Sequence, residues 1–279
     1  MTRFLIGLAA GLLLASAAGA EEVWQTLPQP PAMPTPVESG MAPVRDIQMY
    51  YAVYGEGDPV LLIHGGLGSA DVWGFQIPAL ADKHKVIVAD SRGHGRSTRS
   101  DQPYSYALMA DDYVALLDYL KIDKTALVGW SDGAIIGLDI AMRHPERLSR
   151  LFAFGANYTV EGWNASADDP VFNAAIARTG EDYARLSPTP GEFDAFKAQI
   201  SEMWATQPNY TKNQLRAITV PTVVFDGDHD EGIEPAHTAE MAELIPGAKL
   251  VIMKDASHFA LWQQPDEFNA TVLEFLDGK

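Results

Sequence analysis

The sequence predicts an α/β fold: a doubly wound, mostly parallel sheet with a helical lid inserted between two core strands. Three observations predict it. Short apolar runs alternate with helical patterns, several of these runs contain no polar residue, and two of them lead directly into glycine-rich turns. Uninterrupted apolar strands are typical of a sheet that helices cover on both faces. Strand–helix alternation with right-handed crossovers makes such a sheet parallel.

The composition fits one globular domain and excludes several classes of partner. The chain has 279 residues, 47% of them hydrophobic, and a chain of this length can bury a substantial core in one domain. Its formal net charge of −17 would repel nucleic acid and anionic membranes, and no basic run or stripe interrupts it. The chain contains no cysteine, so disulfides and thiolate metal sites are excluded.

The first twenty residues predict export. The apolar run from Phe4 to Leu14 follows a positive residue, and Ala18 and Ala20 suit cleavage by signal peptidase. This run is shorter than the ~20 apolar residues that a membrane-spanning helix needs. We therefore expect residues 1–20 to be a signal peptide. After its cleavage, we expect the protein to be periplasmic or secreted and to have no membrane span.

Residues 21–45 are predicted to be a proline-rich arm, because five prolines between positions 28 and 36 disfavour helix. A single α/β domain is then predicted to cover residues 46–279. Apolar runs predict strands at Ile47–Tyr54, Val60–His64, Val86–Asp90, Ala126–Trp130, Leu151–Phe154, Thr222–Asp226 and Leu250–Met253. Helical spacing predicts helices at Tyr106–Leu120, Ala134–Arg143 and Pro265–Leu276.

The interval from about residue 157 to 216 breaks this alternation, because it contains two helical patterns and no convincing strand. The second pattern opens at Thr189-Pro190-Gly191-Glu192, which predicts a capping box with proline at the first helical position. An insertion of this kind between two core strands predicts a helical lid. An ordinary extra packing layer is the alternative.

The strongest chemical signal is Gly129-Trp130-Ser131-Asp132-Gly133, which follows a predicted strand and precedes a predicted helix. A nucleophile on so sharp a turn crowds its neighbours, so glycine is needed two residues before and two after it. The turn presents the serine hydroxyl at the carboxyl edge of the sheet, where open α/β sheets bind ligands. We predict that Ser131 is a nucleophile; an inert serine in a glycine-flanked turn is the alternative.

An acid and a base follow two later strands. Asp230 comes after the strand at Thr222–Asp226, and His258 comes after the strand at Leu250–Met253. A serine hydroxyl needs a histidine to take its proton, and that histidine needs a carboxylate on its other ring nitrogen. We therefore predict a catalytic triad of Ser131, Asp230 and His258.

A second glycine-rich turn, within Ile63–Gly68, predicts an oxyanion hole. Its glycines let the backbone curl so that the N–H of Gly66, together with the N–H of Asp132, points at the substrate oxygen. His64 in the same turn is interpreted as structural, because a loop histidine of this kind more often braces a turn than titrates.

No metal site is predicted. Asp226, Asp228 and Asp230 resemble the start of a calcium loop, but glycine falls at the seventh position and His237 stands where the loop needs glutamate. No H-E-x-x-H zinc motif occurs. The predicted chemistry needs no metal or organic cofactor.

Taken together, these motifs resemble the α/β-hydrolase superfamily over residues 47–279. The order Ser…Asp…His is the order of that superfamily. The motifs that agree are H-G-G at His64, D-S-R-G-H-G-R-S at Asp90–Ser97, G-W-S-D-G, Gly227 with Asp230, and S-H-F-A-L-W-Q-Q-P-D-E-F around His258.

Within the superfamily, G-W-S-D-G and the later Phe154–Asn157 are similar to valacyclovir hydrolase and its bacterial relatives. This resemblance implies an amino-acid ester hydrolase. Dehalogenases and epoxide hydrolases of the superfamily use aspartate where this chain has Ser131, so those chemistries are not expected. One departure is Ala134, where many relatives carry a second glycine, and alanine is small enough for the turn.

The sequence therefore predicts a serine hydrolase that cleaves carboxylic esters or lactones of small molecules through an acyl-enzyme. Trp130 and Asp132 are predicted to contact the substrate. Asp132 either pairs with a substrate α-ammonium or only complements the helix dipole. Three other functions stay open: carbon–carbon bond hydrolysis, cofactor-free perhydrolysis, and ligand binding with a vestigial triad. The acyl group, the alcohol and the oligomeric state are not predicted.

Overall fold

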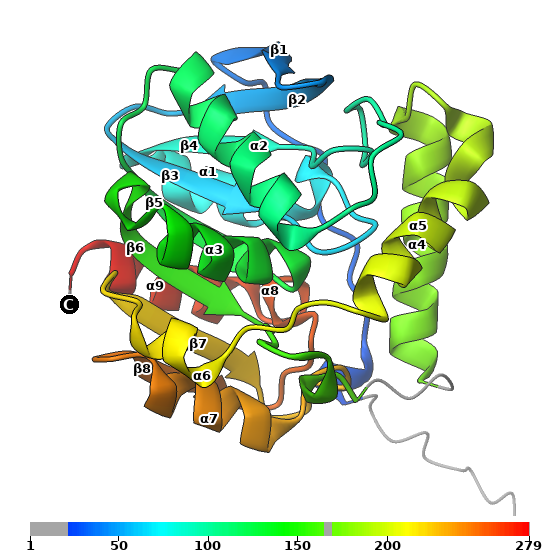
Figure 1. Ribbon diagram of the computed structural model, residues 1–279. Coiled ribbons are helices and arrows are strands. Elements are labelled where there is room, and N and C mark those ends of the chain that lie inside the picture. The colour runs from blue at the N-terminus through cyan, green and yellow to red at the C-terminus, as the bar shows by residue number, and fades with distance from the viewer. Residues whose placement is uncertain (1–21, 165–168, 279) are drawn as a thin grey trace, which may run out of the picture.

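A computed structural model describes residues 22–164 and 169–278 (Figure 1). The described strands form one sheet of eight in the order β1-β2-β4-β3-β5-β6-β7-β8. Their bounds are β1 (Glu38–Val44), β2 (Ile47–Tyr54), β3 (Asp58–Ile63), β4 (His84–Ala89), β5 (Thr125–Trp130), β6 (Leu148–Phe154), β7 (Thr222–Gly227) and β8 (Lys249–Met253). The α-helices are α1 (Gln76–Ala81), α2 (Tyr106–Tyr119), α3 (Asp132–Arg143), α4 (Pro170–Leu186), α5 (Phe193–Trp204), α6 (Lys212–Arg216), α7 (Pro235–Leu244), α8 (Ala260–Gln263) and α9 (Pro265–Leu276).

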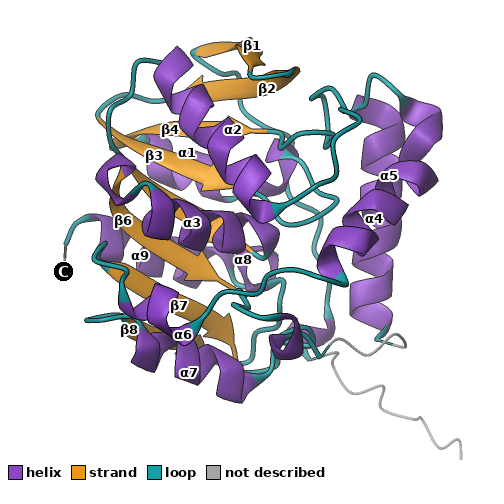
Figure 2. Ribbon diagram, in the orientation of Figure 1, coloured by secondary structure: helices purple, strands orange, loops and turns teal. Residues whose placement is uncertain are grey.

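The sheet is mostly parallel, as predicted. Strands β4, β3, β5, β6, β7 and β8 pair in parallel, and only β1 and β2 at one edge run antiparallel. Helices α2, α3 and α7 cover one face, while α1 and α9 cover the other (Figure 2). Every residue of β5 and of β7 is buried, because both faces of the sheet are covered. All seven predicted strands are present, whereas helices α6, α7 and α8 were not predicted.

One boundary prediction was wrong. The arm was expected to reach residue 45, but residues 38–44 form edge strand β1, which pairs with β2. Ala42 and Val44 alternate with exposed neighbours and pack into the core, which is the period-two pattern of a half-buried strand. Pro43 is tolerated because β1 is an edge strand, where a missing N–H costs no ladder bond on the open side.

The remaining arm, residues 22–37, is extended apart from a single 3₁₀ turn at Val23–Gln25. In Figure 1 it runs between the carboxyl edge of the sheet and helices α4 and α5. The predicted signal peptide, residues 1–20, lies outside the described residues and stays a prediction. Among the helices that are described, none has both the length and the apolarity to span a bilayer.

The predicted helical insertion is present between β6 and β7 and consists of α4, α5 and α6. The predicted capping box at Thr189 was wrong, although proline does stand at the first position of a short 3₁₀ helix there. Glu192 pairs instead with Arg99, 2.5 Å away, so its side chain is not free to reach back to the cap. A capping box does occur at Thr211, where α6 begins.

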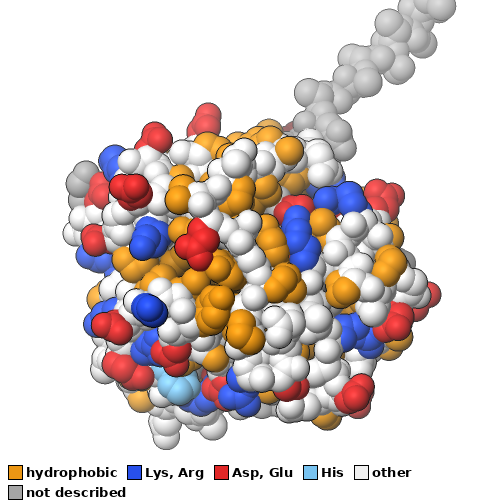
Figure 3. Space-filling view, turned by 90° about the horizontal axis from the view of Figure 1, so that it is seen from above, with side chains coloured by type: hydrophobic (Ala, Val, Ile, Leu, Met, Phe, Trp, Pro, Cys, Tyr) orange, Lys and Arg blue, Asp and Glu red, His pale blue; other side chains and the backbone are white. Residues whose placement is uncertain are grey.

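Charge is distributed without a single-sign stripe on the face seen in Figure 3, where acidic and basic side chains are interspersed among apolar ones. Ion pairs at the surface include Arg147 with Asp118 and Lys212 with Glu240.

Candidate active site

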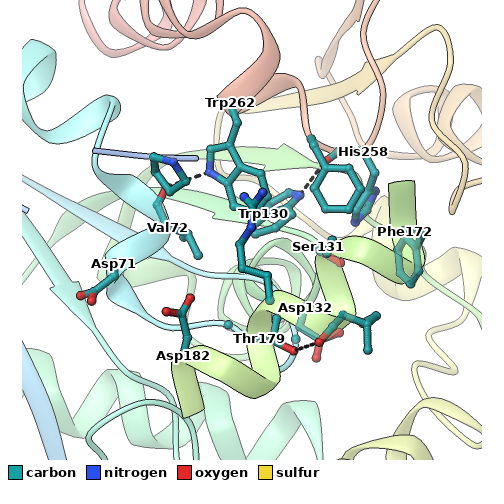
Figure 4. A pocket seen from close by; sticks show the side chains of 18 of the residues that line it. Asp71, Val72, Trp130, Ser131, Asp132, Phe172, Thr179, Asp182, His258 and Trp262 are labelled. Carbon is teal, nitrogen blue, oxygen red and sulfur yellow. Dashed lines mark hydrogen bonds between the residues drawn. The ribbon is translucent and has the colours of Figure 1, made fainter. Parts of the chain in front are cut away.

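The three residues predicted as a triad all stand at the carboxyl edge of the sheet. Ser131 directly follows β5, Asp230 follows β7, and His258 follows β8. Ser131 and His258 line one cavity of about 480 Å³. In Figure 4 they lie with Phe172 at one end of it, and Asp71 and Asp182 lie at the other.

The chain is strained at Ser131, as the motif predicts. Its φ is +55°, a conformation that side-chain-bearing residues rarely adopt. A Cβ on Gly129 would lie 2.4 Å from the carbonyl oxygen of Gly133, and one on Gly133 would lie 2.1 Å from that of Ile63. The backbone N–H of Ser131 donates to Phe154 in the neighbouring strand at 2.8 Å. Gly129 is therefore required by the turn itself, and Gly133 is required because the end of β3 packs against the turn.

His258 and Asp230 form a hydrogen-bonded pair. The distance between His258 Nδ1 and Asp230 Oδ2 is 2.7 Å, and both side chains are almost fully buried. The other oxygen of Asp230 accepts hydrogen bonds from the backbone N–H of Gly232 at 2.7 Å and of Ile233 at 2.8 Å. This arrangement fixes the imidazole with Nδ1 toward the carboxylate and leaves Nε2 for a proton transfer.

Within this pair, the Asp230 carboxylate and the His258 imidazolium each stabilise the charged form of the other. Burial disfavours the imidazolium, but the adjacent Asp230 carboxylate outweighs burial and raises the pKa of His258. Burial also favours a neutral acid at Asp230, yet His258 and the hydrogen bonds hold the pKa of Asp230 below its usual value. Asp226 lies beside Asp230, and burial followed by the Asp230 charge raises the pKa of Asp226 well above normal. Asp226 therefore keeps its proton, and the negative charge stays on Asp230.

Two residues that support His258 were missed by the sequence reasoning. Gly155 has φ +62°, and a Cβ there would lie 2.8 Å from His258 Cε1. The Glu231 carboxylate accepts a hydrogen bond from the backbone N–H of His258 at 3.0 Å. Gly155 stood within a motif that resembles relatives, but nothing in the local sequence signals its contact with a histidine 103 residues later.

Gly66 and Asp132, predicted to form the oxyanion hole, both line the cavity beside Ser131. A Cβ on Gly66 would lie 2.6 Å from the Asp132 carboxylate and 2.4 Å from the Trp204 ring, so only glycine fits. Within the described part of the chain, neither backbone N–H donates to a protein acceptor. Two free N–H groups at this position are what an oxyanion hole requires.

His64 braces the same turn, as interpreted from the sequence. Its Nδ1 contacts the carbonyl of Gly65 at 2.7 Å, and its Nε2 accepts the backbone N–H of Ser91 at 3.0 Å. Burial lowers the pKa of His64, so the ring stays neutral and both nitrogens remain committed to the fold.

Aromatic side chains form much of the cavity wall. Trp130, predicted to contact the substrate, lines it and donates its indole N–H to the carbonyl of His258 at 2.8 Å. Trp163, Phe172 and Trp204, which all lie between β6 and β7, and Trp262 from α8 line it as well. Trp130 therefore both shapes the cavity and ties the nucleophile turn to the histidine loop.

Asp132 is a buried carboxylate that lines the cavity, and the side chains that hydrogen-bond to it are neutral. Its Oδ1 accepts the hydroxyl of Tyr106 at 2.8 Å, and the indole N–H of Trp204 lies 3.0 Å from both oxygens. Among the described residues, no cationic side chain forms an ion pair with it. Burial raises the pKa of Asp132 to about 6, and the two hydrogen bonds moderate that effect.

The acidic loop does not form the calcium site that was considered and rejected. Asp226 accepts the hydroxyl of Thr238 at 2.6 Å, and Asp230 holds His258, so both carboxyl groups are already engaged by protein side chains. Among the described residues, the exposed trio Asp228, His229 and Asp255 has ligand atoms close enough to share a cation. Exposed acidic groups are common without one, and this trio lies outside the cavity.

Comparisons with known proteins agree with the fold. The family model described as "alpha/beta hydrolase fold" matches residues 58–173. A putative carbamate hydrolase, RutD, of Azorhizobium caulinodans is 29% identical over 82% of this chain and 95% of its own. The serine hydrolase BPHL of Homo sapiens is 29% identical over 88% of each chain. The structure of Est816, an N-acyl homoserine lactone degrading enzyme, is 30% identical over 85% of this chain and 100% of its own, with a TM-score of 0.68.

Proposed function

The chain belongs to the α/β-hydrolase family, and from that premise we propose that it cleaves carboxylic esters or lactones of small molecules with a serine nucleophile. The observation that carries this proposal is the 2.7 Å pair of His258 and Asp230 at the same sheet edge as the strained Ser131 turn. One relative is named a serine hydrolase and another degrades a lactone, which supports this class of chemistry.

In the proposed reaction, the Ser131 hydroxyl attacks the carbonyl carbon while His258 Nε2 takes its proton. The N–H groups of Gly66 and Asp132 stabilise the oxyanion, an interaction whose loss typically costs about 10²–10³ in rate. His258 then returns the proton to the leaving alcohol, and water releases the acyl group by the same steps. Asp230 stabilises the imidazolium that forms in each half of the reaction.

The test is hydrolysis of a p-nitrophenyl ester series from acetate to octanoate by the wild type and by Ser131→Ala. We expect turnover in the wild type that is lost in the variant. Ser149→Ala is a matched control, since Ser149 is an exposed serine on β6 outside the cavity. Ester turnover that persists in Ser131→Ala would overturn the assignment of the nucleophile.

If the folded wild type turned over no ester, carbon–carbon bond hydrolysis or ligand binding would replace this proposal. Both use the same cavity and the same predicted residues. Perhydrolysis would be identified separately, by peroxide-dependent formation of a peracid from an ester that also hydrolyses.

A narrower proposal concerns amino-acid esters. Asp132 is a buried carboxylate whose hydrogen-bond partners are neutral, and an α-ammonium group beside the scissile carbonyl would supply a directly paired cation. The measurement compares Asp132→Asn with the wild type on an amino ester and on its des-amino analogue. We expect a selective loss on the amino ester, because asparagine keeps the shape and the backbone N–H. Equal losses on both substrates would contradict recognition of the ammonium group.

The predicted signal peptide leads us to propose that the protein acts in the periplasm or outside the cell. N-terminal sequencing of the protein expressed with residues 1–20 would test this. We expect the mature chain to start at Glu21, and retention of the leader would contradict it.

A further inference from the structure

The N-terminal arm borders the predicted active site. Residues 29–33 line the same cavity as Ser131 and His258. Within this segment Pro31 and Ala32 are exposed and Met33 is half-buried, so an apolar surface is left open to the cavity. The proline backbone is extended and already restricted before folding, so little further entropy is lost when the segment becomes part of a binding wall.

The insertion holds one side of the arm through Arg178 on α4. Its Nη1 donates to the carbonyl of Pro28 at 3.0 Å and its Nη2 to that of Leu27 at 2.7 Å. The guanidinium also lies over the Trp262 ring, 5.4 Å from its centroid. Arg178 therefore connects the insertion, the arm and the cavity wall.

The core holds the other side of the arm at Gly74. A Cβ on Gly74 would lie 2.1 Å from the carbonyl oxygen of Pro31, and its other near neighbours also belong to Pro31. Gly74 has φ −55° and ψ −33°, so alanine fits its backbone conformation without strain. An alanine there would act by displacing the arm.

The arm also reaches the loop that carries His258. The Gln263 amide donates to the carbonyls of Trp24 and Thr26 and to the Ser257 hydroxyl, all within 3.0 Å. Ser257, the last residue in this set of contacts, directly precedes His258. The arm is thus fixed at three places around the cavity: by the insertion, by the core and by the histidine loop.

We propose that residues 29–33 of the arm are a wall of the substrate site and contact the part of the substrate that lies distant from the scissile bond. This inference rests on the proposed function of the same cavity. It makes the arm a determinant of specificity, with Arg178 and Gly74 as positioning residues. Contact with the arm should strengthen the binding of longer apolar substrates, whereas short substrates do not reach the arm.

The experiment measures covalent inactivation by p-nitrophenyl alkylphosphonates of short and long chain, which label a serine nucleophile without requiring turnover. In the wild type, each methylene that reaches the arm should improve the inactivation efficiency by about fourfold, the equivalent of ~0.8 kcal/mol. In Gly74→Ala and in Arg178→Ala, we expect the long-to-short ratio to fall about tenfold, through weaker binding of the long inhibitor. The ratio is independent of the fraction of folded protein.

Matched controls exist for both variants. Arg147 also donates to backbone carbonyls, those of Ile122 and Asp123, but lies away from the cavity. Gly191 has open space around its Cβ position. Arg147→Ala and Gly191→Ala should leave the ratio unchanged.

The outcomes separate the two proposals. An unchanged ratio in both Gly74→Ala and Arg178→Ala would overturn the arm as a binding wall. Labelling without ester turnover would instead contradict the proposed ester chemistry, and the ratio would still report on the arm. A fall in the ratio in both variants, with unchanged controls, would support the arm as a wall whichever bond the enzyme cleaves.

Discussion

The nucleophile turn at Ser131 and the arm at residues 22–37 border the same cavity, but the protein holds them in different ways. The residues on either side of Ser131 are buried, and the closest neighbours of the two glycines are backbone atoms. The arm is largely exposed and depends on a few side-chain anchors, chiefly Arg178 and Gln263. The difference suggests that geometry demanding accuracy is built on the sheet, while contacts that choose the substrate are carried by a segment that can change without disturbing the core.

The largest expected effect falls on the sheet side of this comparison. Asp230→Asn should lower kcat by about 10⁴, because the amide no longer fixes the imidazole tautomer or stabilises its positive charge. KM should change little, since Asp230 does not line the cavity. Steady-state kinetics on a p-nitrophenyl ester would measure both.

Asp228→Asn is the control, because Asp228 lies in the same loop and does not contact His258. If the two variants lost activity equally, the pair of Asp230 and His258 would have no special part in the reaction.

A smaller effect is expected at Gly155. Alanine there places a Cβ 2.8 Å from the His258 ring in a backbone with φ +62°, so the imidazole must shift. A displacement of about 1 Å at a reacting group can cost on the order of 10² in rate. The measurement is kcat together with the free energy of unfolding.

Gly247→Ala is the matched control, because Gly247 has φ +74° with open space around it. It should lose comparable stability with unchanged kcat. A similar fall in kcat for both variants would mean that backbone strain alone, and not contact with His258, lowers activity.

The contrast between these two regions also separates what the sequence could predict from what it could not. The Ser131 turn follows from local crowding, so glycine spacing within five residues is sufficient to predict it. The order of the strands then brings Asp230 and His258 to the same edge. Gly155 and Glu231 act through contacts between distant segments, and no local pattern reports them.

The arm was anticipated as an extended segment because its prolines disfavour helix. Its place in the cavity wall depends on Arg178, 150 residues after Pro28, and on Gln263, 239 residues after Trp24. The predicted end of the arm, residue 45, was wrong for a related reason. Pro43 is typical of a proline-rich arm, and the segment is a strand only because it pairs with β2.

A pH effect of intermediate size tests Asp132, another residue that lines the cavity. The pKa of Asp132 is raised to about 6, so its carboxylate is charged above that pH and neutral below it. Recognition of an α-ammonium therefore requires a pH above about 6 and weakens as the pH falls through that value. The preference for an amino ester over its des-amino analogue should rise about tenfold from pH 5 to pH 7.

The ratio of the two substrates cancels the titration of His258, which acts on both. Asp132→Asn should give a ratio that does not vary with pH. A pH-dependent ratio in that variant would assign the effect to another group.

The smallest expected effect returns to the arm. The Trp24 ring stacks on His229, with centroids 4.3 Å apart and planes within 11°, and so ties the start of the arm to the loop that carries Asp230. Trp24→Ala should lower the free energy of unfolding by about 0.5–1.5 kcal/mol, the usual contribution of an aromatic pair. Because the Asp230 carboxylate is fixed independently by backbone N–H groups, kcat on a short ester should stay within about twofold of the wild type. A large loss of kcat in the folded variant would mean that the arm supports the acid–base pair itself, and the division between a rigid catalytic edge and an adaptable wall would then fail.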